Sequence, residues 1–191
     1  MAILFFFIML ILVLIISVSW TTYKGSPWVP SSMRMVGQML DLAKIEPDEV
    51  VYDLGCGDGR LLVSAARKYK ARGVGIELNP LLWLWCQILI TVLGLRDRVT
   101  VRLGNFYSSD LSDADVVACY LLPATNKKLE DKLISELRPG TRVVTNTFIF
   151  YQTRMAESDG KARLYIFSPE NTQVEFIKAQ LKASADKKIN G

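Results

Sequence analysis

The sequence predicts an α/β fold: a twisted, mostly parallel sheet with helices on both faces, closed by a C-terminal antiparallel hairpin and preceded by a transmembrane helix. Three observations predict it. From residue 50 onward, short apolar segments alternate with helical patterns, which is typical of right-handed βαβ units in a parallel sheet. Half of the 191 residues are hydrophobic, so one domain can bury a full core. Ahead of this domain lies one continuous apolar run.

The apolar run at the N-terminus has the length of a membrane span. Residues 2–16 are all apolar, and extension to Trp20 adds only two serines. As a helix, residues 2–20 would be about 28 Å long, close to the hydrocarbon thickness of about 30 Å. A cleaved signal peptide is the alternative, but the basic residues that begin such a peptide are missing. Because the first basic residues follow the run, the positive-inside rule places the domain in the cytoplasm.

The chain divides at changes in composition. We expect residues 1–20 to be a single-pass membrane anchor. Residues 21–30 contain two prolines and a glycine and are expected to form a linker or a lip. The domain is expected over residues 31–179, and residues 180–191 form a polar tail.

The elements of the domain follow from periodicity and capping signals. Ser31 or Ser32 can cap a first helix that runs to about Lys44, because its apolar residues recur at helical spacing. The predicted parallel strands are the segments 50–54, 73–77, 98–103, 115–122 and 141–150. The helices between them are expected to end at about Tyr69, to run from Asn79-Pro80 to about Leu93, and to cover residues 125–137. The closing hairpin is predicted from residues 164–168 and 173–179.

The helix after the second strand is unusually apolar. Residues 81–95 contain no charge, and their only polar side chains are Gln87 and Thr91. A helix that covers a sheet needs an apolar stripe on only about a third of its circumference. Either a C-terminal segment buries the other side, or that side stays uncovered and rests on a bilayer, on the anchor or on an apolar substrate.

Composition excludes several classes of function. There is no histidine, which removes His-based triads, His-ligated metal sites and histidine pH switches. The cysteines, Cys56, Cys86 and Cys119, form no CxxC pair, so we expect no metal ligands, and such thiols suit a reducing compartment. The formal net charge of +4 allows an anionic partner but requires none, and nucleic acid is not an expected partner.

The informative motif lies at the end of the first predicted strand. Residues 53–60 read DLGCGDGR, a glycine loop that opens a helix at the sheet edge where open α/β sheets bind ligands. The spacing is GxGxG, so the dinucleotide fingerprint GxGxxG fails, and no GK[ST] follows to make a P-loop. Glu77 ends the second strand, where an acid can accept both hydroxyls of a ribose bound over the loop.

This pattern resembles motif I of class I S-adenosylmethionine-dependent methyltransferases, whose domains are Rossmann-like. The resemblance narrows to small seven-strand protein lysine methyltransferases, which include archaeal broad-specificity enzymes and membrane-anchored mitochondrial enzymes. The latter modify the ATP synthase c subunit and the adenine nucleotide translocase. The resemblance covers about residues 26–150, and the segments that carry it are SPWVPS, VVYDLGCGDGR, GIELNP, GNF, YLLP and LRPGTRVV. The family usually has Tyr where Trp28 stands, and little matches after Thr145.

The resemblance implies a set of residues that bind the cofactor S-adenosylmethionine. Asp53, Gly55 and Gly57 would hold its methionine moiety, together with Cys56 and Gly59 of the same loop. Glu77 would hold the ribose. Asn105 or Phe106, after the third strand, would border the adenine. Asn105 could alternatively make a simple turn.

The resemblance also implies a substrate side. Trp28, with Pro27 and Pro30, would form a lip near the methyl group and the entering lysine, and Tyr120, in the segment YLLP, would line the same side. Trp28 and Tyr120 are therefore the candidate catalytic residues. A tryptophan at the membrane interface and a tyrosine in the core are the alternative interpretations.

The predicted activity is S-adenosylmethionine-dependent methylation of lysine side chains in a protein substrate, with a membrane-embedded protein as a candidate. Without histidine, the proton of the amine leaves to water or to a carboxylate; Asp110, Asp113 and Asp115 are near in sequence, and none can be assigned. The alternatives are methylation of a lipid, quinone or other small apolar molecule, methylation of RNA, and a membrane-bound adaptor that binds the cofactor without chemistry. No basic-aromatic patch supports RNA.

Overall fold

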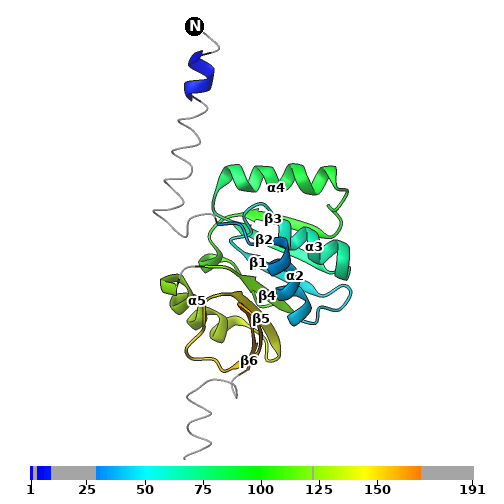
Figure 1. The fold of residues 1–191 in the computed structure, drawn as a ribbon, viewed down its shortest axis with the longest axis vertical. Coiled ribbons are helices and arrows are strands. Elements are labelled where there is room, and N and C mark those ends of the chain that lie inside the picture. The colour runs from blue at the N-terminus through cyan, green and yellow to red at the C-terminus, as the bar shows by residue number, and fades with distance from the viewer. Residues whose placement is uncertain (2–3, 10–28, 122, 169–191) are drawn as a thin grey trace, which may run out of the picture.

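The computed structural model describes residues 1, 4–9, 29–121 and 123–168 (Figure 1). Within these residues, one sheet of seven strands has the order β3-β2-β1-β4-β5-β7-β6. The strands are β1 Val50–Leu54, β2 Arg72–Glu77, β3 Val99–Leu103, β4 Val116–Cys119, β5 Thr141–Asn146, β6 Met155–Asp159 and β7 Ala162–Phe167. Strands β1 to β5 pair in parallel, and β7 pairs antiparallel with both β5 and β6. The predicted mostly parallel sheet with a C-terminal antiparallel pair is confirmed.

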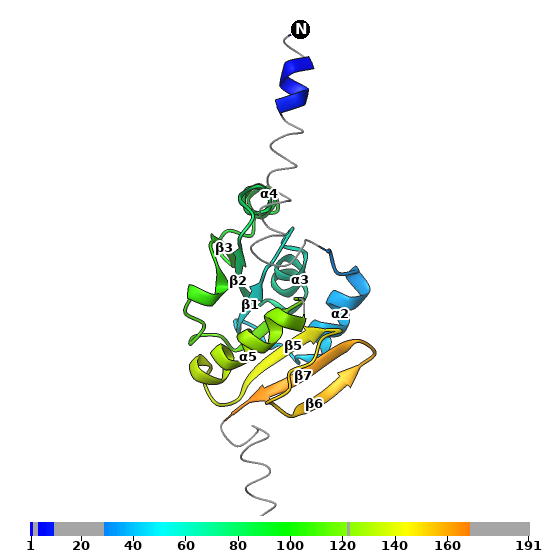
Figure 2. The same cartoon turned by 90° about the vertical axis from the view of Figure 1, so that its left-hand side faces the viewer.

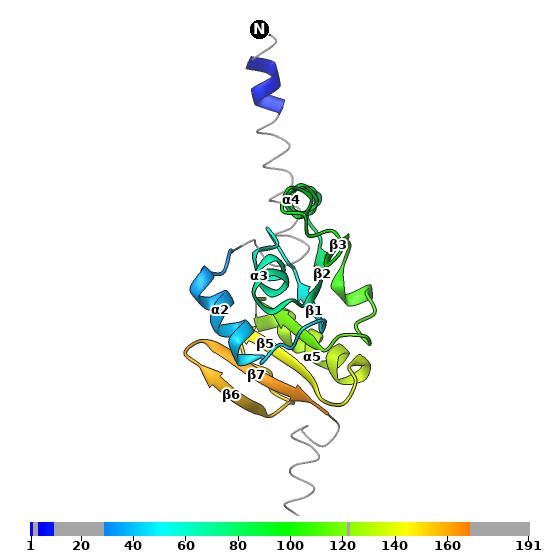
Figure 3. The ribbon, with the colours of Figure 1, turned by 90° about the vertical axis from the view of Figure 1, so that its right-hand side faces the viewer.

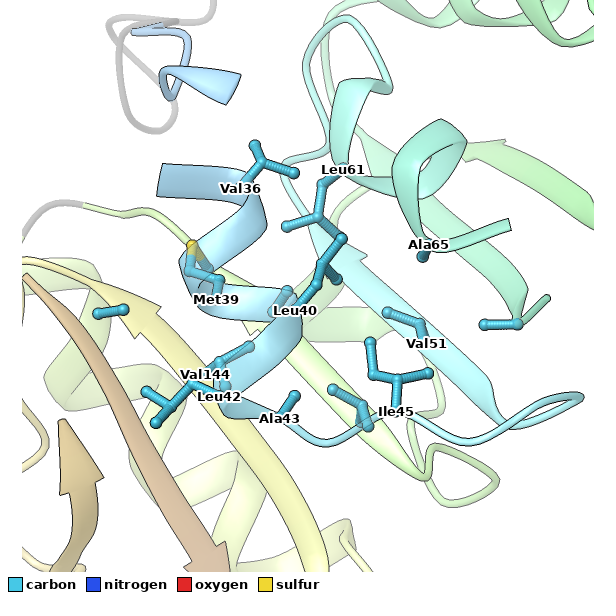
Figure 4. Close-up of a cluster of buried hydrophobic side chains, with 14 of the residues drawn as sticks. Val36, Met39, Leu40, Leu42, Ala43, Ile45, Val51, Leu61, Ala65 and Val144 are labelled. Carbon is cyan, nitrogen blue, oxygen red and sulfur yellow. The ribbon is translucent and has the colours of Figure 1, made fainter. Parts of the chain in front are cut away.

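Helices cover both faces of the sheet, as predicted. They are α2 Met33–Leu42, α3 Arg60–Tyr69, α4 Pro80–Val92 and α5 Pro123–Glu136, with a 3₁₀ helix η1 at Phe106–Ser108. On one face, Val36 and Leu40 of α2 and Leu61 of α3 pack on the sheet (Figure 4). On the other face, Leu129 and Leu133 of α5 pack on alternate residues of the same strands (Figure 2). Alternating side chains of a strand point to opposite faces, which is why both faces of the central strands are buried.

The predicted helix starts follow from their caps. The Ser32 side chain accepts a hydrogen bond from the backbone N–H of Met35 at 3.2 Å. The Asn79 side chain accepts from Leu81 and Leu82, and Pro80 takes the first helical position, where its missing N–H costs nothing. These side chains satisfy backbone donors that the helix itself cannot pair.

The closing hairpin was predicted from the wrong pair of segments. Residues 164–167 of the first segment do lie in β7, but the hairpin partner of β7 is β6, and the predicted partner 173–179 lies outside the described residues. All five residues of β6 are exposed. The strand therefore lacks the alternation of apolar and polar residues from which a strand is predicted. Strand β5 ends at Asn146 rather than at residue 150, because Thr147 takes a φ of +71° and turns the chain.

The predicted anchor falls mostly outside the described residues, since residues 2–3 and 10–20 belong to the part that is not described. Residues 4–9 are helical and exposed. In the described part of the chain, no helix has the length and apolarity that a membrane crossing requires. The predicted polar tail at 180–191 also lies outside the described residues.

Candidate functional site

The glycine loop turns the chain from β1 into α3. Gly55, Gly57 and Gly59 all have positive φ values, of +78°, +57° and +78°, a conformation that glycine adopts at little cost. The N–H groups of Gly55 and Cys56 donate to the carbonyl of Ile76 in β2, at 2.9 and 3.2 Å. The loop is therefore held against the carboxyl end of the neighbouring strand.

Glu77 ties this loop to the start of α4. One of its carboxylate oxygens accepts from the N–H of Gly57 and the other from the N–H of Asn79, both at 2.8 Å. The side chain is only 7% exposed. Burial raises the pKa of Glu77, although the N–H groups of Asn79 and Gly57 oppose this by favouring the carboxylate. A single acid thus joins the two segments that follow β1 and β2.

Asp53 is the second buried acid of the site. Burial, with the nearby charges of Glu77 and Asp58, raises the pKa of Asp53 to about 7. Asp58 itself pairs with Arg60, whose Nε donates to it at 2.9 Å. Arg60 also donates to the carbonyl of Ser31 at 2.6 Å. The arginine therefore connects the glycine loop to the segment that precedes α2.

These residues surround one cavity at the carboxyl ends of β1, β2 and β4. Of the predicted residues, those that line it are Asp53, Gly55, Cys56, Gly57, Glu77, Phe106, Tyr120 and Pro30. The topology brings them together because parallel strands end at the same edge of the sheet. Tyr120 follows β4 directly, and its ring stacks with that of Phe148 at a centroid distance of 6.1 Å.

Two of the described residues that were predicted for the site, Gly59 and Asn105, are not part of this lining. Gly59 is the N-cap residue of α3, and a side chain at this position would meet the sulfur of Cys86. Asn105 is exposed, and its side chain caps η1 by accepting from the N–H of Tyr107 at 3.0 Å, so in this structure it makes the turn that was the alternative interpretation. Trp28 lies outside the described residues, as does Pro27.

The structure adds lining residues that the sequence did not indicate. Leu78, Asn79 and Leu82 line the cavity from the segment after Glu77, and Met39 lines it from α2. The position of Leu78 and Asn79, directly after a predicted strand, was the available signal. Met39 carried no such signal, because its apolar spacing is that of any core residue of a helix.

The cysteines offer no exposed thiol, and two of the acids near the site in sequence, Asp113 and Asp115, are occupied elsewhere in the fold. All three thiols are buried, and burial raises the pKa of Cys119 to about 12, so thiolate chemistry is disfavoured there. Asp115 accepts from the N–H of Val50 at 2.8 Å, and Asp113 accepts from the hydroxyl of Tyr52 at 2.7 Å. Because Val50 begins β1, Asp115 lies at the end of the sheet away from the cavity.

The raised pKa of Asp53 predicts a pH dependence of stability. Between its ordinary pKa near 4 and the native value of about 7, the folded chain holds a proton that the unfolded chain has released. The free energy of unfolding should therefore fall as pH rises from about 4 to 7, by about 1.4 kcal/mol for each unit of the pKa difference. Denaturant unfolding of the protein and of Asp53→Asn across this range measures it. In Asp53→Asn, the free energy of unfolding should no longer show this part of the fall with pH. If the two proteins give parallel curves of unfolding free energy against pH, Asp53 does not have the raised pKa.

Comparison with known proteins bears directly on this cavity. The family described as the ANTKMT methyltransferase domain matches residues 53–157. A protein-lysine N-methyltransferase of Saccharolobus islandicus (strain REY15A) is 42% identical over 123 residues, which are 64% of this chain and 76% of that protein. An adenine nucleotide translocase lysine N-methyltransferase of Mus musculus is 34% identical over 64% of this chain, and the match spans about half of that relative, 53% of its length.

Solved structures of methyltransferases in complex with S-adenosyl-L-homocysteine also superimpose on this chain. An RNA methyltransferase from Salinibacter ruber in complex with S-adenosyl-L-homocysteine superimposes with a TM-score of 0.66 and 39% identity, over 73% of this chain and 92% of that one. A methyltransferase from Geobacter sulfurreducens, with the same ligand, superimposes with a TM-score of 0.54 and 28% identity, over 60% of this chain and 48% of that one.

The residues of the cavity fit S-adenosylmethionine. Its sulfonium and ammonium groups are cations, and the carboxylates of Asp53, Asp58 and Glu77 line the cavity. Its carboxylate suits the N-terminus of α3, whose N-cap residue, Gly59, has no side chain to cap the helix. The glycines let the backbone approach the ligand closely. The chain therefore belongs to the family of ANTKMT methyltransferase domains and is an S-adenosylmethionine-dependent methyltransferase with a Rossmann-like fold.

Proposed function

We propose that this chain methylates lysine side chains of a protein. The observation that carries the proposal is that Pro30, Tyr120 and Leu121 line the same cavity as the carboxylates and make part of its lining apolar. Methyl transfer is an in-line displacement that needs a neutral amine, close alignment and little water. Freeing the amine of lysine at pH 7 costs about 4.6 kcal/mol, and an apolar wall favours the neutral form. The names of the Saccharolobus islandicus and Mus musculus relatives support the same substrate class.

We further propose that residues 1–20 anchor the domain to a membrane with the domain on the cytoplasmic side. The continuous apolar run and the basic residues that follow it support this arrangement. In the described helix at residues 4–9, Phe5 and Phe6 are exposed, so these side chains are free to contact lipid. Resistance of the full chain to alkaline extraction, and protection of the domain from protease added to intact cells, would support the anchor. A mature chain that begins near Trp20 would contradict it.

The substrate class is tested with the full chain, methyl-labelled S-adenosylmethionine and a membrane fraction of the host. Protein, lipid and RNA are separated after the reaction, and labelled protein is hydrolysed for amino-acid analysis. Label on methylated lysine supports the proposal. Label confined to lipid would favour an apolar small molecule, and label in RNA would favour the activity for which the Salinibacter ruber methyltransferase is named. Cofactor binding with no label in any fraction would favour an adaptor.

Replacing Tyr120 by alanine should lower turnover far more than cofactor affinity. The ring stacks on Phe148 and lines the cavity, so its loss misplaces the entering amine while the glycine loop stays intact. We expect turnover to fall roughly ten- to a hundred-fold, and the dissociation constant for the cofactor to change little. Labelled-methyl transfer and calorimetry separate the two quantities. Tyr151→Ala, at a tyrosine that is 61% exposed, is the control, and equal losses in both quantities for Tyr120→Ala would place this ring at the cofactor instead.

A further inference from the structure

Helix α4 has a second apolar face that the described domain leaves uncovered. Leu84, Trp85, Ile88 and Val92 are 48%, 54%, 52% and 77% exposed. At 100° per residue these four side chains fall within an arc of about 100°, which is as wide as the stripe that an ordinary helix uses to cover a core. Together they form what we term the outer face of α4.

The inner side of α4 holds the helix on the sheet. Cys86 and Ile90 are buried against β3. The side-chain N–H groups of Trp83 and Gln87 both donate to the carbonyl of Val101, at 3.0 and 2.8 Å. These bonds also occupy an edge strand that would otherwise offer unpaired backbone groups. The outer face is therefore not needed to hold the helix on the sheet.

The outer face also offers water almost nothing to bind. The hydroxyl of Thr91 donates back to the carbonyl of Gln87 at 2.6 Å and accepts from the guanidinium of Arg96 at 2.8 Å. No charged residue occurs between Pro80 and Leu95. Contiguous apolar surface of this kind on a domain marks a contact.

The position of α4 indicates what it contacts. The helix lies along one end of the domain (Figure 3), and its residue Leu82 lines the same cavity as Val29 and Pro30. Pro30 is only ten residues from Trp20, where the apolar run ends. Ten residues reach at most about 35 Å when fully extended. An anchor at residues 1–20 thus keeps Pro30 within that distance of a bilayer, and with it the cavity that the first turn of α4 also lines.

We infer that the outer face of α4 lies flat on the bilayer surface and turns the methyl-transfer cavity towards it. The inference rests on the proposed anchor. Thirteen residues span about 20 Å, too short to cross the hydrocarbon and long enough to lie in its interface. Trp85 has the amphipathic ring that this interface favours, and Arg96 at the end of the helix can meet anionic head groups. The preferred lysines are then those near a membrane surface.

Fluorescence quenching by brominated lipids tests this contact in the full chain. The three native thiols are buried, so a thiol-reactive environment-sensitive probe labels an introduced cysteine selectively. The reporter is Ile88→Cys on α4, and the matched control is Ser158→Cys on exposed β6. The protein is reconstituted in vesicles of phosphatidylcholine and phosphatidylglycerol with brominated chains, and flotation measures membrane attachment separately.

The inference expects attached protein in which the Ile88 probe is quenched several-fold more than the Ser158 probe. The added substitution Trp85→Glu should abolish this difference, whereas Ile134→Glu, at an exposed apolar residue of α5, should preserve it. Attached protein with equal quenching would overturn the contact while leaving the anchor standing, and protein that fails to float would overturn both. Cross-links from position 88 to a second copy or to residues 2–20, without lipid quenching, would identify another occupant and also overturn the inference.

Discussion

Replacing Glu77 by alanine should weaken S-adenosylmethionine binding roughly a hundred-fold or more. The side chain is buried, and its two oxygens accept from the N–H groups of Gly57 and Asn79. Loss of a hydrogen bond to a charged group costs about 1.5–3 kcal/mol, or roughly ten- to a hundred-fold. Alanine removes the acceptor predicted for the ribose, and it also releases the two segments that shape the cavity. Both effects weaken the binding of S-adenosylmethionine.

Calorimetry with S-adenosylmethionine and with S-adenosylhomocysteine measures the loss. Glu77→Gln should fall between the protein and the alanine variant, because an amide keeps one acceptor oxygen but turns a donor towards the other N–H. Asp97→Ala, which removes an exposed acid, is the matched control and should bind normally. If Glu77→Ala folds and binds within a factor of three, the acid is not part of the cofactor site.

Replacing Glu130 by alanine should lower the free energy of unfolding by about 3 kcal/mol or more. This glutamate of α5 is only 1% exposed. Its carboxylate accepts from three consecutive N–H groups, those of Tyr151, Gln152 and Thr153, at 2.8–2.9 Å. A buried polar group without its partner costs about 1–3 kcal/mol, and alanine leaves three backbone N–H donors without their acceptor.

Denaturant unfolding measures this loss, and Asp131→Ala is the matched control. Asp131 is the next residue of α5, but it is exposed and accepts from the flexible side chain of Gln152 rather than from buried backbone N–H groups, so its removal should cost less than about 1 kcal/mol. A loss below 1 kcal/mol for Glu130→Ala would show that water replaces the carboxylate. Because the loop that Glu130 holds follows Phe148, the partner of Tyr120, the variant should also lower turnover at temperatures where it remains folded.

Local patterns in the sequence predicted the parallel half of the fold because each of its strands and helices is recorded in a short stretch of consecutive residues. Strands β1 to β4 are short segments rich in β-branched and other apolar residues, and the glycine loop lies directly after the first of them. Strand β6 was missed because a strand with every residue exposed has no buried face to reveal it. The outer face of α4 was one of two predicted alternatives, and within the described residues it is exposed.

By itself, the sequence determined which residues stand at the carboxyl ends of β1 and β2, and therefore that Asp53, the glycines and Glu77 share one site. That inference needs only chain order and the parallel pairing of strands. The tertiary structure decided which groups bond across it: Glu77 with the loop twenty residues before it, Glu130 with the loop after β5, and Tyr120 with Phe148. Such pairs depend on the separation of elements after packing, to within about an ångström, and no periodicity within a single element records that distance.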